Sequence, residues 1–177
     1  MSTHRDDGPT GDIVLEFNGR KAAFSLPQRD SDHVQKSLMS GGKFYEHEML
    51  AHAASVLRPG DLVIDIGAYI GTHTVFYGAI CEARVIAFEP NPRSRAILER
   101  NVALNRLQER VTIFPFGIGQ HPSRATVVTP GTSNQGMASL SLDEAGPVEV
   151  RRLDDVELPA PPRVIKIDVE GMELEVL

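Results

Sequence analysis

The chain has 177 residues, of which 41% are hydrophobic and 24% are charged, as is typical of one soluble globular domain. Its net charge of −6 offers no general attraction to phosphate backbones, so we expect no nucleic acid partner. No apolar run approaches the ~20 residues that cross a bilayer, and the first residues lack the apolar core of a signal peptide, so no membrane partner is expected. The single cysteine, Cys81, excludes an internal disulfide and a cysteine-based zinc site and favours a reducing, cytoplasmic setting.

The N-terminal part is expected to contain a disordered tail, a β-hairpin and a helix. Residues 1–11 are polar and are predicted to form the tail. Residues 12–58 follow, and their Asn18-Gly19 pair supplies the positive φ angles of a tight turn between two runs with strand character. Apolar residues at helical spacing after Lys43 then predict a helix that Pro59-Gly60 ends.

Strands and helices are predicted to alternate in the core, residues 59–177. Short apolar runs predict buried strands at residues 62–67, 83–90 and 110–116, and helices are expected at residues 72–80 and 92–107. Residues 117–162 are less regular, with strands expected at 125–129 and 148–153. A last buried strand is expected at 164–171, before the start of a helix. This alternation predicts an α/β fold with a Rossmann-like, doubly wound and mostly parallel sheet.

The first of these strands runs into a glycine loop, in the sequence VIDIGAYIGTHT. Ligands of such sheets bind at the carboxyl ends of the strands, where Gly67 would let the backbone turn close to a ligand and Gly71 would allow tight packing at the helix start. A simple turn that needs glycine explains the loop equally well. The loop has one glycine fewer than the G-x-G-x-x-G pattern of dinucleotide sites, and the charge of Asp65 at its mouth would repel a phosphate.

A second acid, Glu89, ends the next predicted strand, in the sequence AFEPNP. An acid about 20 residues after such a loop often binds the hydroxyls of a ribose. The alternative is a solvated residue at a strand end. Asp65 and Glu89 together favour a nucleoside with a cationic arm that carries no phosphate, and S-adenosylmethionine is that molecule.

Four segments resemble the FkbM family of S-adenosylmethionine-dependent methyltransferases: VIDIGAYIGTHT, VIAFEPNP, LDDV and IKIDVEGMELEVL. The resemblance extends from about Lys43 to the end of the sequence, and the last segment is its most specific part. Tyr69 departs from the family pattern, in which Asn is commoner at this position. The family's domain normally continues well beyond the last segment, so C-terminal strands are expected to be missing from this sequence.

The resemblance implies a role for each residue around the cofactor. Its methionine part would be lined by Gly67, Ala68, Tyr69 and Gly71, with donors to its carboxylate from Thr72 and His73. Glu89 would bind the ribose hydroxyls, and the adenine would lie among Pro90, Asn91, Gly117 and Ile118.

Two acids in the last segment are candidates for catalysis. By its similarity to other methyltransferases, Asp168 would lie beside the sulfonium and is the first candidate for the base that accepts a proton from a substrate hydroxyl. Glu170 is the second candidate, although an acid beside Gly171 also suits the positive end of a helix. The histidines are scattered without metal-ligand spacing, so no metal site is expected.

These observations favour an O-methyltransferase that acts on a small metabolite or a glycan hydroxyl. A nucleoside-binding module without catalysis is the alternative, and a nicotinamide dehydrogenase is disfavoured by the missing glycine and by Asp65. The truncated fold would leave an apolar strand at the sheet edge. Three explanations are open: the chain is a fragment of a longer protein, which is favoured, a partner chain such as a second copy in a homodimer covers this edge, or the product is a degraded relic.

Overall fold

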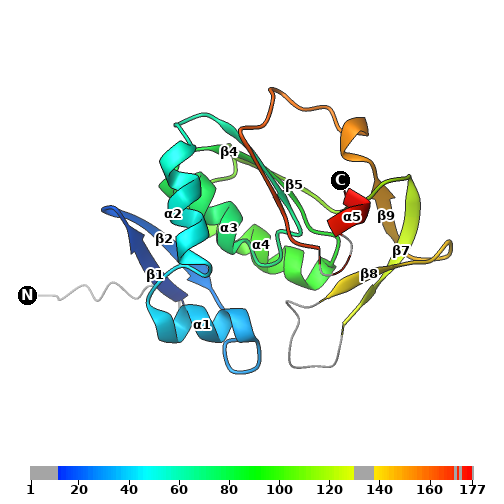
Figure 1. Ribbon diagram of the computed structural model, residues 1–177. Coiled ribbons are helices and arrows are strands. Elements are labelled where there is room, and N and C mark those ends of the chain that lie inside the picture. Colours follow the sequence, from blue (N-terminus) through cyan, green and yellow to red (C-terminus); the bar gives the residue numbers. More distant parts are fainter. Residues whose placement is uncertain (1–11, 130–137, 170, 172, 177) are drawn as a thin grey trace, which may run out of the picture.

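A four-stranded parallel sheet with the order β10–β3–β4–β5 forms the centre of the molecule (Figure 1). The computed structural model describes residues 12–129, 138–169, 171 and 173–176. The sheet strands are β3 (Leu62–Ile66), β4 (Arg84–Phe88), β5 (Val111–Phe114) and β10 (Val164–Ile167). The parallel α/β fold predicted from the sequence is confirmed, because each strand arises from one of the predicted apolar runs.

Alternate residues of the central strands face two separate cores, as the period of a strand requires. Val63 and Val85 face a large core that the helices and the N-terminal hairpin cover. Ile64 and Ile86 face a second core with Phe116, at which the short 3-10 helix Leu153–Asp155 also packs. Both faces of β3 are therefore buried, which explains why all of its residues except Asp65 are apolar.

The hairpin predicted around Asn18-Gly19 is confirmed as β1 (Asp12–Phe17) and β2 (Arg20–Ser25), with both turn residues at positive φ. Helix α2 (His47–Val56) is the helix predicted before Pro59. Between them lies α1 (His33–Gly41), a helix that was not predicted from the sequence. It begins where the Asp32 side chain accepts a hydrogen bond from the Gln35 N–H, an ordinary N-cap.

Two helices follow β3 and β4, as expected. The first is α3 (Thr72–Val75), which continues as a π-helical turn, Phe76–Ile80. The second is α4 (Pro92–Leu104), which begins with an Asn91 cap and a proline in its first turn.

The less regular region forms a second sheet that was not predicted as a unit. Its order is β6–β9–β7–β8, and Figure 1 shows it on the opposite side of the central sheet from the hairpin. The strands expected at 125–129 and 148–153 are found within this sheet, whose members are β6 (Gly117–Ile118), β7 (Ser123–Val128), β8 (Ser139–Leu142) and β9 (Val148–Arg151).

Strand β10 has one neighbour, β3, among the described residues, and its Ile165 side chain is exposed. The homodimer expected from this edge stays a prediction. The expected tail, residues 1–11, lies outside the described residues, and α5 (Glu173–Val176) is the start of the last predicted helix. Within the described ranges, no helix is long and apolar enough to span a membrane.

Candidate functional site

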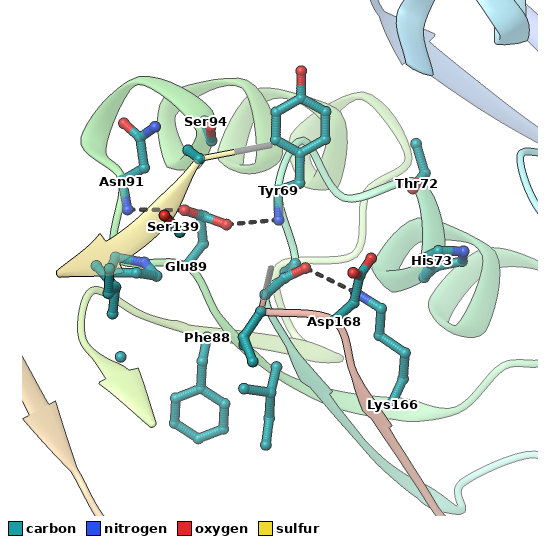
Figure 2. Close-up of a pocket in the computed structure, with 18 of the residues that line it drawn as sticks. Tyr69, Thr72, His73, Phe88, Glu89, Asn91, Ser94, Ser139, Lys166 and Asp168 are labelled. Atoms are coloured by element: carbon teal, nitrogen blue, oxygen red, sulfur yellow. Dashed lines mark hydrogen bonds and ion pairs between the residues drawn. The ribbon is translucent and has the colours of Figure 1, made fainter. Parts of the chain in front are cut away.

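A cavity of about 420 Å³ opens at the carboxyl ends of β3, β4 and β10, where ligands of parallel sheets bind (Figure 2). Most of the residues singled out from the sequence line it, namely Gly67, Ala68, Tyr69, Thr72, His73, Glu89, Pro90, Asn91, Gly117, Ile118 and Asp168. Asp65 and Gly71 do not line it. Glu170 lies outside the described residues.

Glu89 is a buried carboxylate held between two backbone donors. Its Oε2 accepts a hydrogen bond from the Tyr69 N–H at 2.7 Å, and its Oε1 accepts one from the Asn91 N–H at 2.8 Å (Figure 2). Only 6% of the residue is exposed. Burial raises the pKa of Glu89 to about 7, although the two N–H donors act in the opposite direction. The side chain is therefore fixed in position and still has lone pairs for a ligand in the cavity.

Asp65 does not lie at the mouth of the glycine loop, where its charge was expected to face a ligand. The residue is fully buried beneath the loop, where Thr74 Oγ1 donates a hydrogen bond to it and Lys166 Nζ lies 3.1 Å from its Oδ1. Burial alone would raise the pKa of Asp65, but the Lys166 ammonium and the Thr74 hydroxyl hold it below its usual value. Because Lys166 neutralises this carboxylate out of reach of the cavity, Asp65 is not the acid that faces a ligand.

The glycine loop packs closely against the end of β10. A Cβ atom added at Gly67 would lie 1.9 Å from the Asp168 carbonyl oxygen, and the residue has a φ of +75°. The Gly67 and Ala68 N–H groups both donate to the Phe88 carbonyl, so these two donors bind the neighbouring strand. Gly71, with φ +85°, packs on Leu98 of α4, in agreement with the packing role expected for it.

Asp168 follows β10 and presents its side chain to the cavity. The side chain is 53% exposed, and its Oδ2 lies 3.6 Å from Lys166 Nζ. Among the labelled side chains of Figure 2, Asp168 and Lys166 lie together, apart from Glu89 and Asn91. The cavity therefore has one acid at the end of β4 and another at the end of β10.

A third acid reaches the cavity from the N-terminal region. This acid is Glu46, which immediately precedes α2. The distance between its Oε2 and the Nε2 of the buried His73 is 3.1 Å. This contact lowers the pKa of the Glu46 carboxyl, against the effect of its partial burial. Tyr45 also lines the cavity.

Tyr69 has a left-handed backbone conformation, with a φ of 51°, which an asparagine would adopt more readily than a tyrosine. Its N–H donates to the Glu89 carboxylate. Its ring is partly buried, and burial strongly raises the pKa of its phenol.

Other lining residues were not predicted as parts of the site. Lys166 is one, and the only sequence signal for it is a lysine within the apolar run VIKI. His33 and Val34 come from the unpredicted helix α1, whereas the second sheet supplies Val127, Ala138, Ser139 and Leu140. These residues approach through long-range contacts that leave no local pattern in the sequence.

The charges of the lining residues suit a cationic ligand. Glu46, Glu89 and Asp168 are acids, whereas the Lys166 ammonium is already paired with two carboxylates. These acids would repel a pyrophosphate, whereas they would stabilise a sulfonium or ammonium group. The described residues contain no cluster of three acids, histidines or cysteines that could hold a metal ion.

Comparison with known proteins identifies the family to which the chain is similar. Residues 65–177 match the model of the Methyltransferase FkbM domain. The chain is 32% identical to the hexuronic acid methyltransferase AglP of Haloferax volcanii over 171 residues, which cover 93% of this chain and 66% of that protein. It is 28% identical to Methyltransferase 1 of Beauveria bassiana, with 65% of this chain and 56% of that protein covered. The chain thus spans about two thirds or less of the length of these relatives.

Solved structures give a partial overlap. TYW2 of P. horikoshii in complex with MeSAdo is 23% identical, with a TM-score of 0.41 and coverage of 62% of this chain and 38% of that one. The family match contains the glycine loop, Glu89 and Asp168, so it confirms the resemblance seen in the sequence. The chain belongs to the FkbM family of methyltransferases, and S-adenosylmethionine, the cofactor expected from its sequence, is the methyl donor of that family.

Proposed function

We propose that the chain forms the cofactor-binding and catalytic part of an O-methyltransferase that acts on a hydroxyl of a glycan or a small metabolite. The observation that carries this proposal is the position of Glu89. This carboxylate is held by two backbone N–H groups at the end of β4, inside the cavity. An acid at this place suits the two hydroxyls of a ribose, because each carboxylate oxygen keeps a lone pair for a hydroxyl donor.

The residues around Glu89 suit the rest of S-adenosylmethionine. Pro90, Gly117 and Ile118 offer a mostly apolar wall on which the adenine would lie, and Leu140 packs so closely on Gly117 that a Cβ there would lie 2.5 Å from its Cδ1. The methionine part would lie along the glycine loop, near His73. Asp168 and Glu46 would offset its positive charge.

When bound, the cofactor would supply the methyl group from its sulfonium, and its sulfur would keep the electron pair of the broken C–S bond as a neutral thioether. Positioning of the acceptor provides much of the acceleration in such a displacement. Asp168 would accept the proton that an acceptor hydroxyl loses as its oxygen forms the new O–C bond. Its half-exposed side chain can reach both the cavity and an incoming acceptor. Glu170 remains the second candidate for this base.

The acceptor class is supported by the relative that is named a hexuronic acid methyltransferase, of which this chain spans 66%. That name makes sugar hydroxyls the first acceptors to test. A panel should contain uronic acids, neutral hexoses and small alcohols, because the loops that contact acceptors vary most among related enzymes.

Two measurements test the proposal. Calorimetry with S-adenosylhomocysteine should show binding, and NAD should show none. Transfer of a radiolabelled methyl group from S-adenosylmethionine to members of the panel should then be detectable. Binding without transfer to any acceptor would favour the nucleoside-binding module instead, and no binding would defeat both functions.

Variants then identify the base. The Asp168→Asn variant should lose about 100-fold or more in kcat with little change in cofactor affinity, because general bases contribute about 10²–10⁴-fold. The matched control is Asp154→Asn, at an exposed aspartate in the 3-10 helix away from the cavity. A full rate in Asp168→Asn combined with a large loss in Glu170→Gln would assign the proton transfer to Glu170.

A further inference from the structure

Lys166 is a nearly buried cation at the floor of the cavity, and the reaction as outlined above gives it no role. Its side chain is 8% exposed and projects from the last strand, β10, toward the glycine loop. Burial alone would lower the pKa of this lysine, but the carboxylates of Asp65 and Asp168 raise it above its usual value. The side chain is therefore a permanent ammonium.

The ammonium has three N–H bonds and three oxygen neighbours. It donates a hydrogen bond to the Gly67 carbonyl at 2.8 Å, and it lies 3.1 Å from Asp65 Oδ1 and 3.6 Å from Asp168 Oδ2. The three neighbours belong to β3, to the glycine loop and to the residue that follows β10. A single atom thus connects the parts of the site that hold the cofactor and the candidate base.

These three contacts are unequal. Asp65 is fully buried and is also bound by Thr74, so its pair with Lys166 is a fixed anchor. Asp168 is half exposed and stands beyond hydrogen-bond distance, so its side chain is held by charge while it keeps access to the cavity. Because the Asp65 carboxylate balances the charge of the Lys166 ammonium, the net negative charge of these three side chains lies on Asp168.

We propose that Lys166 is a positioning residue, which holds the Asp168 carboxylate and the Gly67 peptide in a fixed relation at the cofactor end of the cavity. This inference rests on the proposed function, because it acts through Asp168. It also predicts an effect that needs no turnover, since loss of the bond to the Gly67 carbonyl should loosen the glycine loop.

The obvious variant, Lys166→Met, leaves Asp65 as an unpaired buried charge and is expected to fold poorly. The double variant Asp65→Asn/Lys166→Met removes both charges of the buried pair and keeps an oxygen that can accept the Thr74 hydrogen bond. Lys36→Met is the matched control, because Lys36 is an exposed lysine on α1. Each protein is first checked for cooperative unfolding.

We expect the double variant to bind S-adenosylhomocysteine within about fivefold of the wild type and to lose at least tenfold in kcat at saturating substrates. The change Asp168→Asn should then cost at least tenfold less in the double variant than in the wild type, because the two residues act as one unit. Hydrogen–deuterium exchange across residues 67–73 should be faster in the double variant and unchanged in the Lys36→Met control.

A folded double variant with wild-type kcat and wild-type exchange would overturn the proposal. Equal costs of Asp168→Asn in both backgrounds would also overturn it, because Lys166 would then act independently of Asp168. If the wild-type protein transfers no methyl group, the proposed function fails, and the exchange of residues 67–73 alone decides whether Lys166 holds the loop.

Discussion

The carboxylate of Glu89 accepts a hydrogen bond from the backbone N–H of Tyr69, so the end of β4 is tied to the loop that follows β3. Tyr69 itself has a left-handed φ of 51°, and the N–H of Asn91, at the start of α4, donates to the other carboxylate oxygen. The site is therefore organised around one side chain that fixes two loops and still faces the cavity.

Removal of the Glu89 carboxylate should abolish tight cofactor binding. The Glu89→Ala variant is expected to raise the dissociation constant of S-adenosylhomocysteine by about 100-fold, because each hydrogen bond to a charged group contributes about 1.5 kcal/mol or more. Calorimetry measures this change. The control Glu99→Ala removes an exposed glutamate of α4, and an affinity loss as large as that of Glu89→Ala would show that the effect is not local.

Cofactor affinity should depend on pH in a defined direction. Burial raises the pKa of Glu89 to about 7, so the carboxyl is mostly protonated at pH 6 and mostly ionised at pH 8. The ionised form accepts hydroxyl hydrogen bonds more strongly, and S-adenosylhomocysteine should bind about tenfold more tightly at pH 8 than at pH 6. In the Glu89→Gln variant this dependence should be flat, and an equal slope in both proteins would assign it to another group.

The local parts of the fold could be predicted from the sequence. The buried strands, the Asn18-Gly19 hairpin and the glycine loop depend on residues that are close in the chain. Helix α1 was missed because its sequence, HVQKSLMSG, contains few apolar residues. The second sheet was missed as a unit because its strands pair over long separations in the sequence and in both directions.

The site was predicted only in part, and Asp65 shows why. Its position at a strand end was correct, but its charge partner lies on β10, where Lys166 is 99 residues away from Gly67 in the sequence. No local pattern shows that a distant lysine neutralises an acid. Glu89 was easier to identify, because its hydrogen-bond donors lie in the loop after the preceding strand and two residues further along the chain.

The close approach of Gly67 to β10 gives a prediction on stability. Gly67→Ala places a Cβ atom 1.9 Å from the Asp168 carbonyl oxygen, whereas Gly60→Ala meets nothing within 4 Å, and both positions have positive φ. Gly60→Ala should reduce the free energy of unfolding by about 1 kcal/mol, the cost of the left-handed conformation. Gly67→Ala should cost about 2 kcal/mol more, because the two strand ends must separate. Urea unfolding measures both values, and equal losses would contradict the role of the close contact.

Two asparagines of α4 allow the support of the hairpin and the support of the site to be tested separately. Both bind β2, since Asn101 Oδ1 accepts from the Ser25 N–H at 2.7 Å and Asn105 Oδ1 accepts from the Ala23 N–H at 2.8 Å. Only Asn101 also donates to the Ile70 carbonyl in the glycine loop, at 2.8 Å, and Asn101 is fully buried.

Replacement of either asparagine by alanine should therefore destabilise the protein, but only one replacement should weaken cofactor binding. Asn101→Ala leaves two buried backbone groups without partners and is expected to cost about 2 kcal/mol or more in unfolding free energy. Asn105→Ala should cost less, because water can reach this half-buried site. The dissociation constant of S-adenosylhomocysteine should rise severalfold in Asn101→Ala and stay unchanged in Asn105→Ala. If the two variants bind equally well, the glycine loop keeps its conformation without the bond from Asn101 to Ile70.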